Sequence, residues 1–209
     1  MKKLVLALTL VLWLSCESNE PVVYEGPLLF ERMTSESTGL NFTNTVTNDD
    51  KYNIFSYRYI YNGGGVDIGD VNNDGLADVF LTANMGPNKL FFNQGDWKFE
   101  DVSASAGIEL TNKWSTGVAM VDVNADGWLD IYVCNAGFLK DSDQKNSLFL
   151  NNQDGTFREA AAEFGLDDGG YTTHAAFVDY DLDGDLDVYL LNNSFIPVNT
   201  HNYSNNREQ

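Results

Sequence analysis

One acidic stretch occurs three times in this chain, and it constrains the fold more than any other feature. The copies read DVNNDGLADVFL from Asp70, DVNADGWLDIYV from Asp122 and DYDLDGDLDVYL from Asp179. They share Asp at position 1, Asn or Asp at position 3, Asp at 5, Gly at 6 and Asp at 9. Oxygen side chains at alternate positions, with a glycine for the sharp turn, suit a hard cation such as Ca2+. Asp and Gly also favour plain surface turns, but three copies in phase favour metal loops.

The EF-hand and the related dockerin loop are the closest alternatives, because both match this stretch through position 9. The EF-hand, however, needs a bidentate Glu at position 12 and a helix after the loop. Position 12 is Leu or Val here, and the residues after position 9 are rich in β-branched and aromatic types, which favour strands. We therefore expect loops that connect strands, with position 7 contributing its backbone carbonyl. The closing carboxylates are then Asp78, Asp130 and Asp187.

A second repeated unit lies between the acidic loops. NKLFFNQGDWKFEDVSASAGI from Asn88 matches NSLFLNNQDGTFREAAAEFGL from Asn146 at an offset of 58 residues. It reads as a strand, a turn and a second strand. The acidic loops are 52 and 57 residues apart, so each period holds about four short strands, the content of one propeller blade. The fold class predicted is all-β: β-propeller blades of four-stranded antiparallel sheets, about three of them.

These motifs together resemble the FG-GAP and VCBS repeats of β-propellers, over about residues 28–195. The opening YNGGGVDIGDVNNDGLADVFLTAN is similar to the cartilage-acidic-protein-like, ASPIC/UnbV-associated lipoproteins of Bacteroidetes. The resemblance implies a seven-bladed propeller with Ca2+ in its loops, and usually several hundred further residues. It implies these side-chain ligands: Asp70, Asn72, Asp74 and Asp78; Asp122, Asn124, Asp126 and Asp130; Asp179, Asp181, Asp183 and Asp187. The backbone carbonyls expected at position 7 are those of Leu76, Trp128 and Asp185.

Both ends of the chain predict segments outside the propeller. Residues 1–15 carry two lysines and then an apolar run, which is typical of a signal peptide too short to span a bilayer. Cys16 follows directly and resembles a bacterial lipobox cysteine, although Trp13 stands where Leu is usual; the alternative is an ordinary secretory signal. Residues 16–27 then form an acidic tether. Residues 196–209 are a polar tail, which we interpret as a truncation point with the remaining blades missing after it.

Charge limits the possible partners. The 209 residues carry 31 acidic and 12 basic side chains, a formal net charge of -19. Ten of the acidic residues occupy positions 1, 3, 5 and 9 of the three loops. The acidic surface, without a basic patch, excludes nucleic acid as a partner. Cys134 stands alone in a predicted strand, where we expect a small buried apolar residue and no disulfide.

Two further regions carry weaker predictions. Gly65, Gly117 and His174 occupy the same column before the acidic loops, so we expect a close backbone approach there. His174 breaks the glycine pattern; it either lines a site or is a hydrogen-bonded structural residue. For residues 21–60 the pattern predicts two strands and a loop.

Two functions fit these observations. The first is a calcium-stabilised, non-enzymatic binding or adhesion module of a cell-envelope lipoprotein. It would be anchored through Cys16 in the outer membrane or at the cell surface and would present a propeller face to a protein or glycan. The second is the N-terminal part of a polysaccharide-processing envelope enzyme. We favour the first, because metal ligation accounts for every carboxylate cluster and no nucleophile–base pair stands out.

Overall fold

The computed structural model describes residues 26, 29–50, 52–110, 112–136 and 143–193. The chain forms two compact units, residues 1–32 and 33–209. The predicted signal peptide, Cys16 and the polar tail lie outside the described residues, as does most of the tether. Among the residues described, no helix has the length and apolar character needed to cross a membrane.

The second unit contains two four-stranded antiparallel sheets, which confirms the predicted blades. Blade one has the strand order β1-β2-β3-β4, and blade two has the order β5-β6-β7-β8. The strands of blade one are β1 (Val66–Gly69), β2 (Asp78–Leu81), β3 (Lys89–Asn93) and β4 (Phe99–Asp101). Those of blade two are β5 (Ser115–Val121), β6 (Asp130–Asn135), β7 (Ser147–Asn151) and β8 (Phe157–Glu159).

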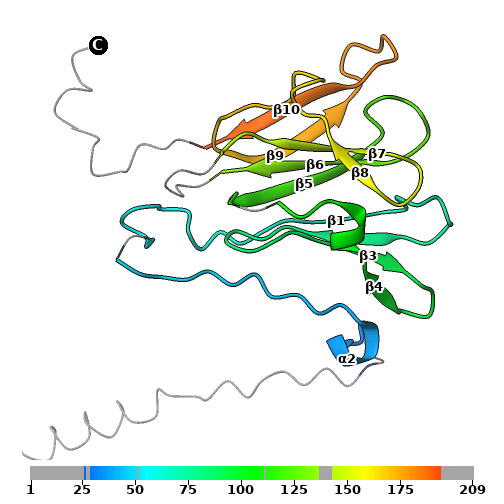
Figure 1. Cartoon of the computed structure of the whole chain (residues 1–209), viewed down its shortest axis with the longest axis horizontal. Helices are drawn as coiled ribbons and strands as arrows, with labels where there is room; N and C mark the ends of the chain where they lie inside the picture. Colours follow the sequence, from blue (N-terminus) through cyan, green and yellow to red (C-terminus); the bar gives the residue numbers. More distant parts are fainter. Residues whose placement is uncertain (1–25, 27–28, 51, 111, 137–142, 194–209) are drawn as a thin grey trace, which may run out of the picture. The chain divides into compact units, whose positions relative to one another are not determined.

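A third sheet repeats the first half of a blade. It pairs β9 (Thr172–Val178) with β10 (Asp187–Asn192), and within the described residues it has these two strands. In Figure 1 the three sheets follow one another, and the first strands β1, β5 and β9 are neighbours. Tyr189 and Leu191 of β10 are 70% and 50% exposed, whereas the corresponding residues of β6, Tyr132 and Cys134, are fully buried.

The core lies between consecutive sheets. The cluster between blades one and two includes Phe80, Leu90, Ile131 and Phe149, and the cluster against the third sheet includes Tyr132, Cys134 and Leu148. Cys134 is the buried apolar residue that the sequence predicts, and burial raises the pKa of its thiol to about 12.

The prediction of two strands in residues 21–60 is wrong for the residues described. The segment has no strand there and contains one short helix, α2 (Ser35–Thr38). Thr34 and Ser37 form a capping box at its start, and Gly39 ends it with a φ of 84°. The Ser, Thr and Gly residues of this segment therefore cap a short helix at both ends and do not connect two strands.

After α2 the described chain is irregular over residues 40–49 and makes hydrogen-bonded turns over residues 53–62, and it joins no sheet before β1. Asn44 exchanges two hydrogen bonds with Asn84: its side-chain Nδ2 donates to Oδ1 at 2.7 Å, and its Oδ1 accepts from the backbone N–H at 3.0 Å. Beyond it, Tyr57 and Ile60 pack with Trp114 in a separate aromatic cluster. The segment between α2 and β1 thus ties the N-terminal part of the unit to both blades.

Candidate metal centre

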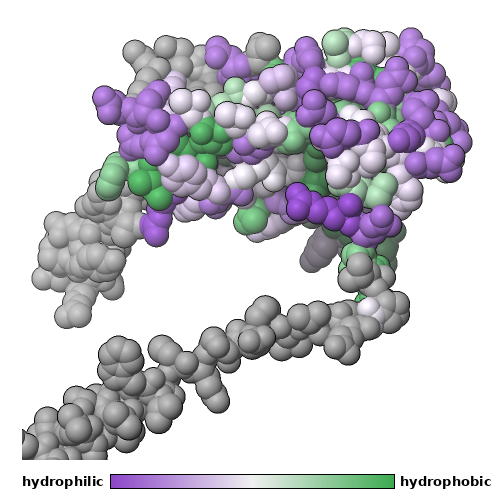
Figure 2. Space-filling model, turned by 90° about the horizontal axis from the view of Figure 1, so that it is seen from below, coloured by the Kyte–Doolittle hydropathy of each residue, from purple (hydrophilic) through white to green (hydrophobic). Residues whose placement is uncertain are grey.

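All three acidic loops lie at the same end of the sheets, on the right of Figure 1, each between the first and second strand of its sheet. Figure 2 views the molecule from below, and hydrophilic residues gather at this same right-hand end. The loops share one backbone conformation. Position 4 has a positive φ in each copy (Asn73 56°, Ala125 57°, Leu182 63°), and so does the glycine at position 6 (Gly75 88°, Gly127 86°, Gly184 98°).

Glycine is required at position 6 by the left-handed backbone conformation and not by a lack of space for a side chain. A Cβ built on Gly75, Gly127 or Gly184 meets nothing within 4 Å, but residues with a side chain rarely adopt a φ near 90°. Position 4 has a left-handed residue that is not glycine in every copy, which costs about 1 kcal/mol each. Such strained turns persist only when other interactions hold them in place.

The Asp at position 1 holds the first two loops in this shape. The Asp70 side chain accepts from the backbone N–H of Asp74 at 3.1 Å and of Gly75 at 2.8 Å. Asp122 does the same for Asp126 at 3.0 Å and Gly127 at 2.8 Å. Both loops therefore turn around a carboxylate that points into their centre, where a cation would lie.

The Asp at position 9 joins the loop to the third strand of its blade. Asp78 is buried; its Oδ2 accepts from Val71 N–H at 3.0 Å and its Oδ1 from Asn93 N–H at 2.8 Å. Burial raises the pKa of Asp78 to about 6, although these two hydrogen bonds act in the opposite direction. Since each carboxylate oxygen has two lone pairs, an ion would share these oxygens with the backbone.

Asp130 has the same arrangement in blade two. Its oxygens accept from Val123 N–H at 3.0 Å and Asn151 N–H at 2.8 Å, and burial again raises its pKa. This second role, in which the position-9 carboxylate links the loop to the third strand, was not among the sequence-based predictions. The signal was available: Asn93 and Asn151 are the second Asn of the repeated N-x-L-F-x-N pattern.

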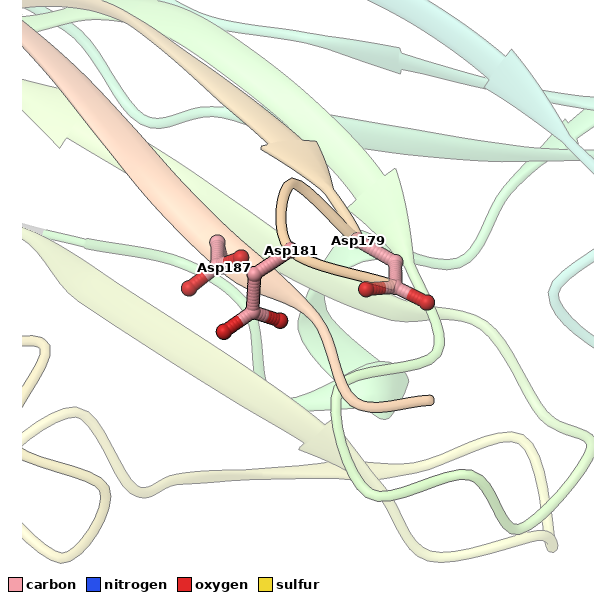
Figure 3. A group of neighbouring side chains, drawn as sticks. All are labelled: Asp179, Asp181 and Asp187. Atoms are coloured by element: carbon pink, nitrogen blue, oxygen red, sulfur yellow. The ribbon is translucent and has the colours of Figure 1, made fainter. Parts of the chain in front are cut away.

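The third loop gathers its carboxylates most closely (Figure 3). Within the described parts of the chain, Asp179, Asp181 and Asp187 are the group of acidic residues whose ligand atoms all lie within 4.8 Å of one another. Oδ2 of Asp179 accepts from Gly184 N–H at 3.2 Å, but its Oδ1 is a buried oxygen without a hydrogen-bond partner. A buried, unpaired carboxylate oxygen among two further carboxylates is an arrangement that a cation would satisfy.

The remaining third-loop residues show the same crowding of negative charge. Asp183 raises the pKa of Asp185 through a side-chain hydrogen bond and through its own charge. Asp187 is exposed, unlike Asp78 and Asp130, and one of its oxygens accepts from Tyr180 N–H at 2.9 Å. The donor set is oxygen throughout, as Ca2+ prefers.

Position 7 keeps one geometry despite its varied chemistry. The backbone N–H groups of Leu76, Trp128 and Asp185 donate to the Oδ1 atom of the Asp at position 5 at 2.8, 2.9 and 3.1 Å. At position 3, the side chains of Asn72 and Asn124 donate to the same Asp at 3.0 Å. Hydrogen bonds thus link predicted ligand positions within each loop. Among the described residues, however, three carboxylates lie within 4.8 Å of one another in the third loop and not in the first two. The carbonyl of position 7 stays a predicted ligand.

The glycine column is the second feature that the sequence predicts, and the close approach is confirmed. A Cβ on Gly65 would lie 2.7 Å from the carbonyl oxygen of Thr116, and one on Gly117 would lie 2.5 Å from that of Thr173. The first strands of neighbouring sheets therefore pass too closely for a side chain. His174 lines a cavity of about 390 Å³ together with Tyr57, Tyr59, Trp114 and the glycines 63–65.

Comparisons with known proteins agree with this architecture. The chain matches the model of the FG-GAP-like repeat over residues 70–133 and 136–190, more than half of its length. It is 35% identical to cartilage acidic protein 1 of Xenopus tropicalis over 137 residues, which is 63% of this chain and 20% of the relative. It is 42% identical to the human protein of that name over 76 residues, 36% of this chain and 12% of the relative. The chain thus spans a fifth or less of the length of these relatives.

Proposed function

Since this chain belongs to the FG-GAP-like repeat family, we propose that it is a calcium-stabilised β-propeller binding module, exported to the cell envelope and without enzymatic activity. The observation that carries the calcium part is the unpaired, buried Oδ1 of Asp179 beside Asp181 and Asp187. The relatives are named cartilage acidic protein 1, and this chain is also strongly acidic, with a net charge of -19.

Calcium would act structurally in these loops. In the third loop, Asp179, Asp181, Asp183 and Asp187 would hold the ion, and the corresponding Asp and Asn residues would hold it in the first two. A bound ion supplies positive charge that offsets the repulsion among the carboxylates. This chain's residues do the rest: the position-1 carboxylate folds the loop, and the position-9 carboxylate connects it to the third strand. Metal binding would therefore fix each blade as well as its loop.

We expect this protein to bind a partner and not to catalyse a reaction, and one cavity fits such a role. The cavity beside His174 offers the rings of Tyr59 and Trp114, backbone groups of three glycines, and the side chains of Asn62 and Thr116. Aromatic rings with nearby hydrogen-bonding groups suit recognition of a protein or glycan. Its described lining contains no carboxylate, whereas glycoside hydrolysis ordinarily uses a pair of them. The polysaccharide-processing alternative would therefore need its carboxylate pair at another site.

The place of action rests on the sequence pattern alone. The apolar run before Cys16 would direct export, and a lipid on Cys16 would hold the protein to an envelope membrane, with the acidic tether giving it reach. The acidic surface disfavours nucleic acid, so the partner is a protein or glycan met outside the cytoplasm.

Calorimetric titration of the chelator-treated protein tests the calcium part. We expect about three sites that prefer Ca2+ to Mg2+, since flexible oxygen-rich loops suit the larger ion, together with a rise in melting temperature. Asp179→Asn should lose one site. Glu100→Gln removes an exposed carboxylate of β4, outside the loops, and should lose none. No calcium-dependent gain in stability, or equal site counts in the two variants, would contradict the proposal.

A glycan array and a protein-binding screen, each with and without Ca2+, test the binding part. If the protein selectively retains a ligand and the ligand is recovered chemically unchanged, the result supports a binding module. Release of a cleaved product from a polysaccharide would favour the enzyme instead.

A further inference from the structure

The first acidic loop (residues 70–78) is hydrogen-bonded directly to the second (residues 122–130). Asn73, at position 4 of the first loop, donates from its side-chain Nδ2 to the carbonyl oxygen of Gly127, at position 6 of the second loop, at 3.1 Å. The two residues belong to neighbouring blades and are 54 positions apart in the sequence. A change in the shape of one loop can therefore be felt by the other.

A second hydrogen bond joins the two loops at another place. The side-chain amide of Asn151, which is 6% exposed, donates to the carbonyl oxygen of Val71, at position 2 of the first loop, at 2.7 Å. The backbone N–H of the same residue donates to Asp130, which closes the second loop. The two loops are thus held to each other at both of their ends.

The bond from Asn73 reaches the part of the second loop that lies next to a predicted metal ligand. The carbonyl of Gly127 and the N–H of Trp128 belong to one peptide unit, and this N–H donates to Oδ1 of Asp126 at 2.9 Å. Asn73 therefore holds one side of that peptide unit and Asp126 holds the other. The next peptide unit carries the carbonyl of Trp128, which is the ligand predicted at position 7.

The second and third loops are not joined in this way. Position 4 is left-handed in all three loops, a conformation that Asn adopts more readily than most residues with a side chain. Asn73 uses the position to reach the second loop, but its counterpart in the second loop, Ala125, has no donor to offer the third. Within the described part of the chain, no hydrogen bond joins the second loop to the third (residues 179–187).

From this asymmetry we propose that Asn73 is a positioning residue for the metal site of the second loop. Through it the first two loops bind Ca2+ cooperatively, whereas the third binds independently of them. The inference rests on the proposed calcium binding. An ion in the first loop orders that loop, and Asn73 carries the order to the second loop, so the second ion has less conformational freedom to remove. Linkage requires the same effect in the opposite direction.

The oxygen donors of the first two loops fit such an ion. Each has Asp at positions 1, 5 and 9 and the amide oxygen of Asn at position 3, which are ligand types that Ca2+ accepts. Repulsion between two bound cations would weaken binding in neighbouring loops, but it would act between the second and third loops as well as between the first and second. The third loop is therefore a matched control for the first.

Sensitised Tb3+ luminescence can follow the second loop alone. Tb3+ enters oxygen-rich Ca2+ sites and emits when a nearby tryptophan absorbs light. Trp128 lies in the second loop, whereas the residues at position 7 of the other loops are not aromatic. Trp97, in the turn between β3 and β4, is changed to Phe in every protein of the experiment. Trp114 directly precedes β5, at the end of that strand opposite the second loop. Competition with Ca2+ then gives the affinity of the second loop for calcium.

The first comparison disables one neighbouring loop at a time. Asp74→Ala removes the position-5 carboxylate of the first loop, and Asp183→Ala removes that of the third. We expect Asp74→Ala to weaken Ca2+ binding in the second loop about five-fold, an effect that one net hydrogen bond can supply. Asp183→Ala should remove the third site and change the second by less than about 1.5-fold. Asp74→Asn replaces the alanine variant if that variant does not fold.

The second comparison removes the bond between the loops. Asn73→Gly deletes the side chain without straining its left-handed backbone, and Leu182→Gly makes the corresponding change in the third loop. We expect Asn73→Gly, and not Leu182→Gly, to weaken binding in the second loop. When Asn73→Gly is present, adding Asp74→Ala should change the affinity of the second loop by less than about 1.5-fold.

The outcomes separate this inference from the calcium proposal. Equal effects of Asp74→Ala and Asp183→Ala, or an effect of Asp74→Ala that persists in Asn73→Gly, would overturn the coupling while the calcium sites remain. If neither Tb3+ nor Ca2+ binds to the second loop of the unmodified protein, both the calcium proposal and the coupling are wrong.

Discussion

The backbone N–H of Asn151 donates to Oδ1 of the buried Asp130 at 2.8 Å, at the place where the second acidic loop meets the third strand of its blade. The side-chain amide of Asn151 also donates to Leu129 O at 3.0 Å and, in the preceding blade, to Val71 O at 2.7 Å. One residue thus joins loop, strand and neighbouring blade. Its counterpart in blade one is Asn93. The backbone N–H of Asn93 donates to Oδ1 of Asp78, and its side-chain Nδ2 donates to Ala77 O at 2.9 Å.

Asn151→Ala should therefore cost more stability than Asn93→Ala. The first variant removes a buried hydrogen bond between blades and leaves the carbonyl of Val71 unpaired, so we expect a loss of about 2–4 kcal/mol. The second removes a more exposed bond within one blade, and we expect a loss of about 1 kcal/mol. Chemical unfolding in Ca2+ measures both free energies. Equal losses would mean that the inter-blade bond contributes little.

The free energy of unfolding of the calcium-free protein should fall as the pH rises from about 4 to about 6. Burial raises the pKa of Asp78 from 3.8 to about 6 in the folded state, so folding favours its protonated form. The stability that this group contributes is fully present below its unfolded pKa and is lost as pH rises through its folded pKa. The change is about 2–3 kcal/mol. The measurement is the free energy of unfolding at several pH values in this range, with a chelator present. We expect it to change less with pH in the Asp78→Asn variant than in the unmodified protein. An equal change in the two proteins would show that Asp78 does not cause it.

Gly117→Ala should destabilise the contact between the first strands of blade two and the third sheet. Its Cβ would lie 2.5 Å from the carbonyl oxygen of Thr173, and separating two strands costs about 1–3 kcal/mol or more. Gly86→Ala is the matched control, because its Cβ would meet only the Cβ of Ala83 at 3.8 Å. We expect its unfolding free energy to change by less than about 0.5 kcal/mol. Thermal unfolding measures both variants. A loss in Gly117→Ala alone would show that the contact with Thr173 causes it, whereas equal losses would show that any glycine-to-alanine change destabilises the protein.

Cys16→Ala should release the protein from the membrane fraction of the cells that make it. The prediction follows from the cysteine directly after the apolar run and before an acidic tether. Fractionation locates the variant, and mass spectrometry of the unmodified protein detects an acyl chain on Cys16. Membrane association that persists in the variant, with no acyl chain on the native protein, would contradict lipid anchoring.

The periodic parts of the chain determined most of the fold by themselves. Three acidic loops and two N-x-L-F-x-N units predict blades, loop positions and the glycine column, because each is a local pattern with one low-energy backbone. The shared left-handed φ at Gly75, Gly127 and Gly184 follows from such a pattern. The buried state of Cys134 follows from its place in a strand between sheets.

Only the tertiary structure decided the rest, since those features depend on partners distant in the sequence. Residues 33–48 have strand-like composition, yet they form a helix and an irregular segment because their contacts lie with Phe99 and Asn84 and not with a sheet edge. Asp78 is a predicted metal ligand from its loop, but its bond to Asn93, 15 residues away, makes it a link between loop and strand as well. Asp187, with the same local sequence, stays exposed because no described third strand covers it. Burial and pairing, which no local pattern encodes, separate these two carboxylates.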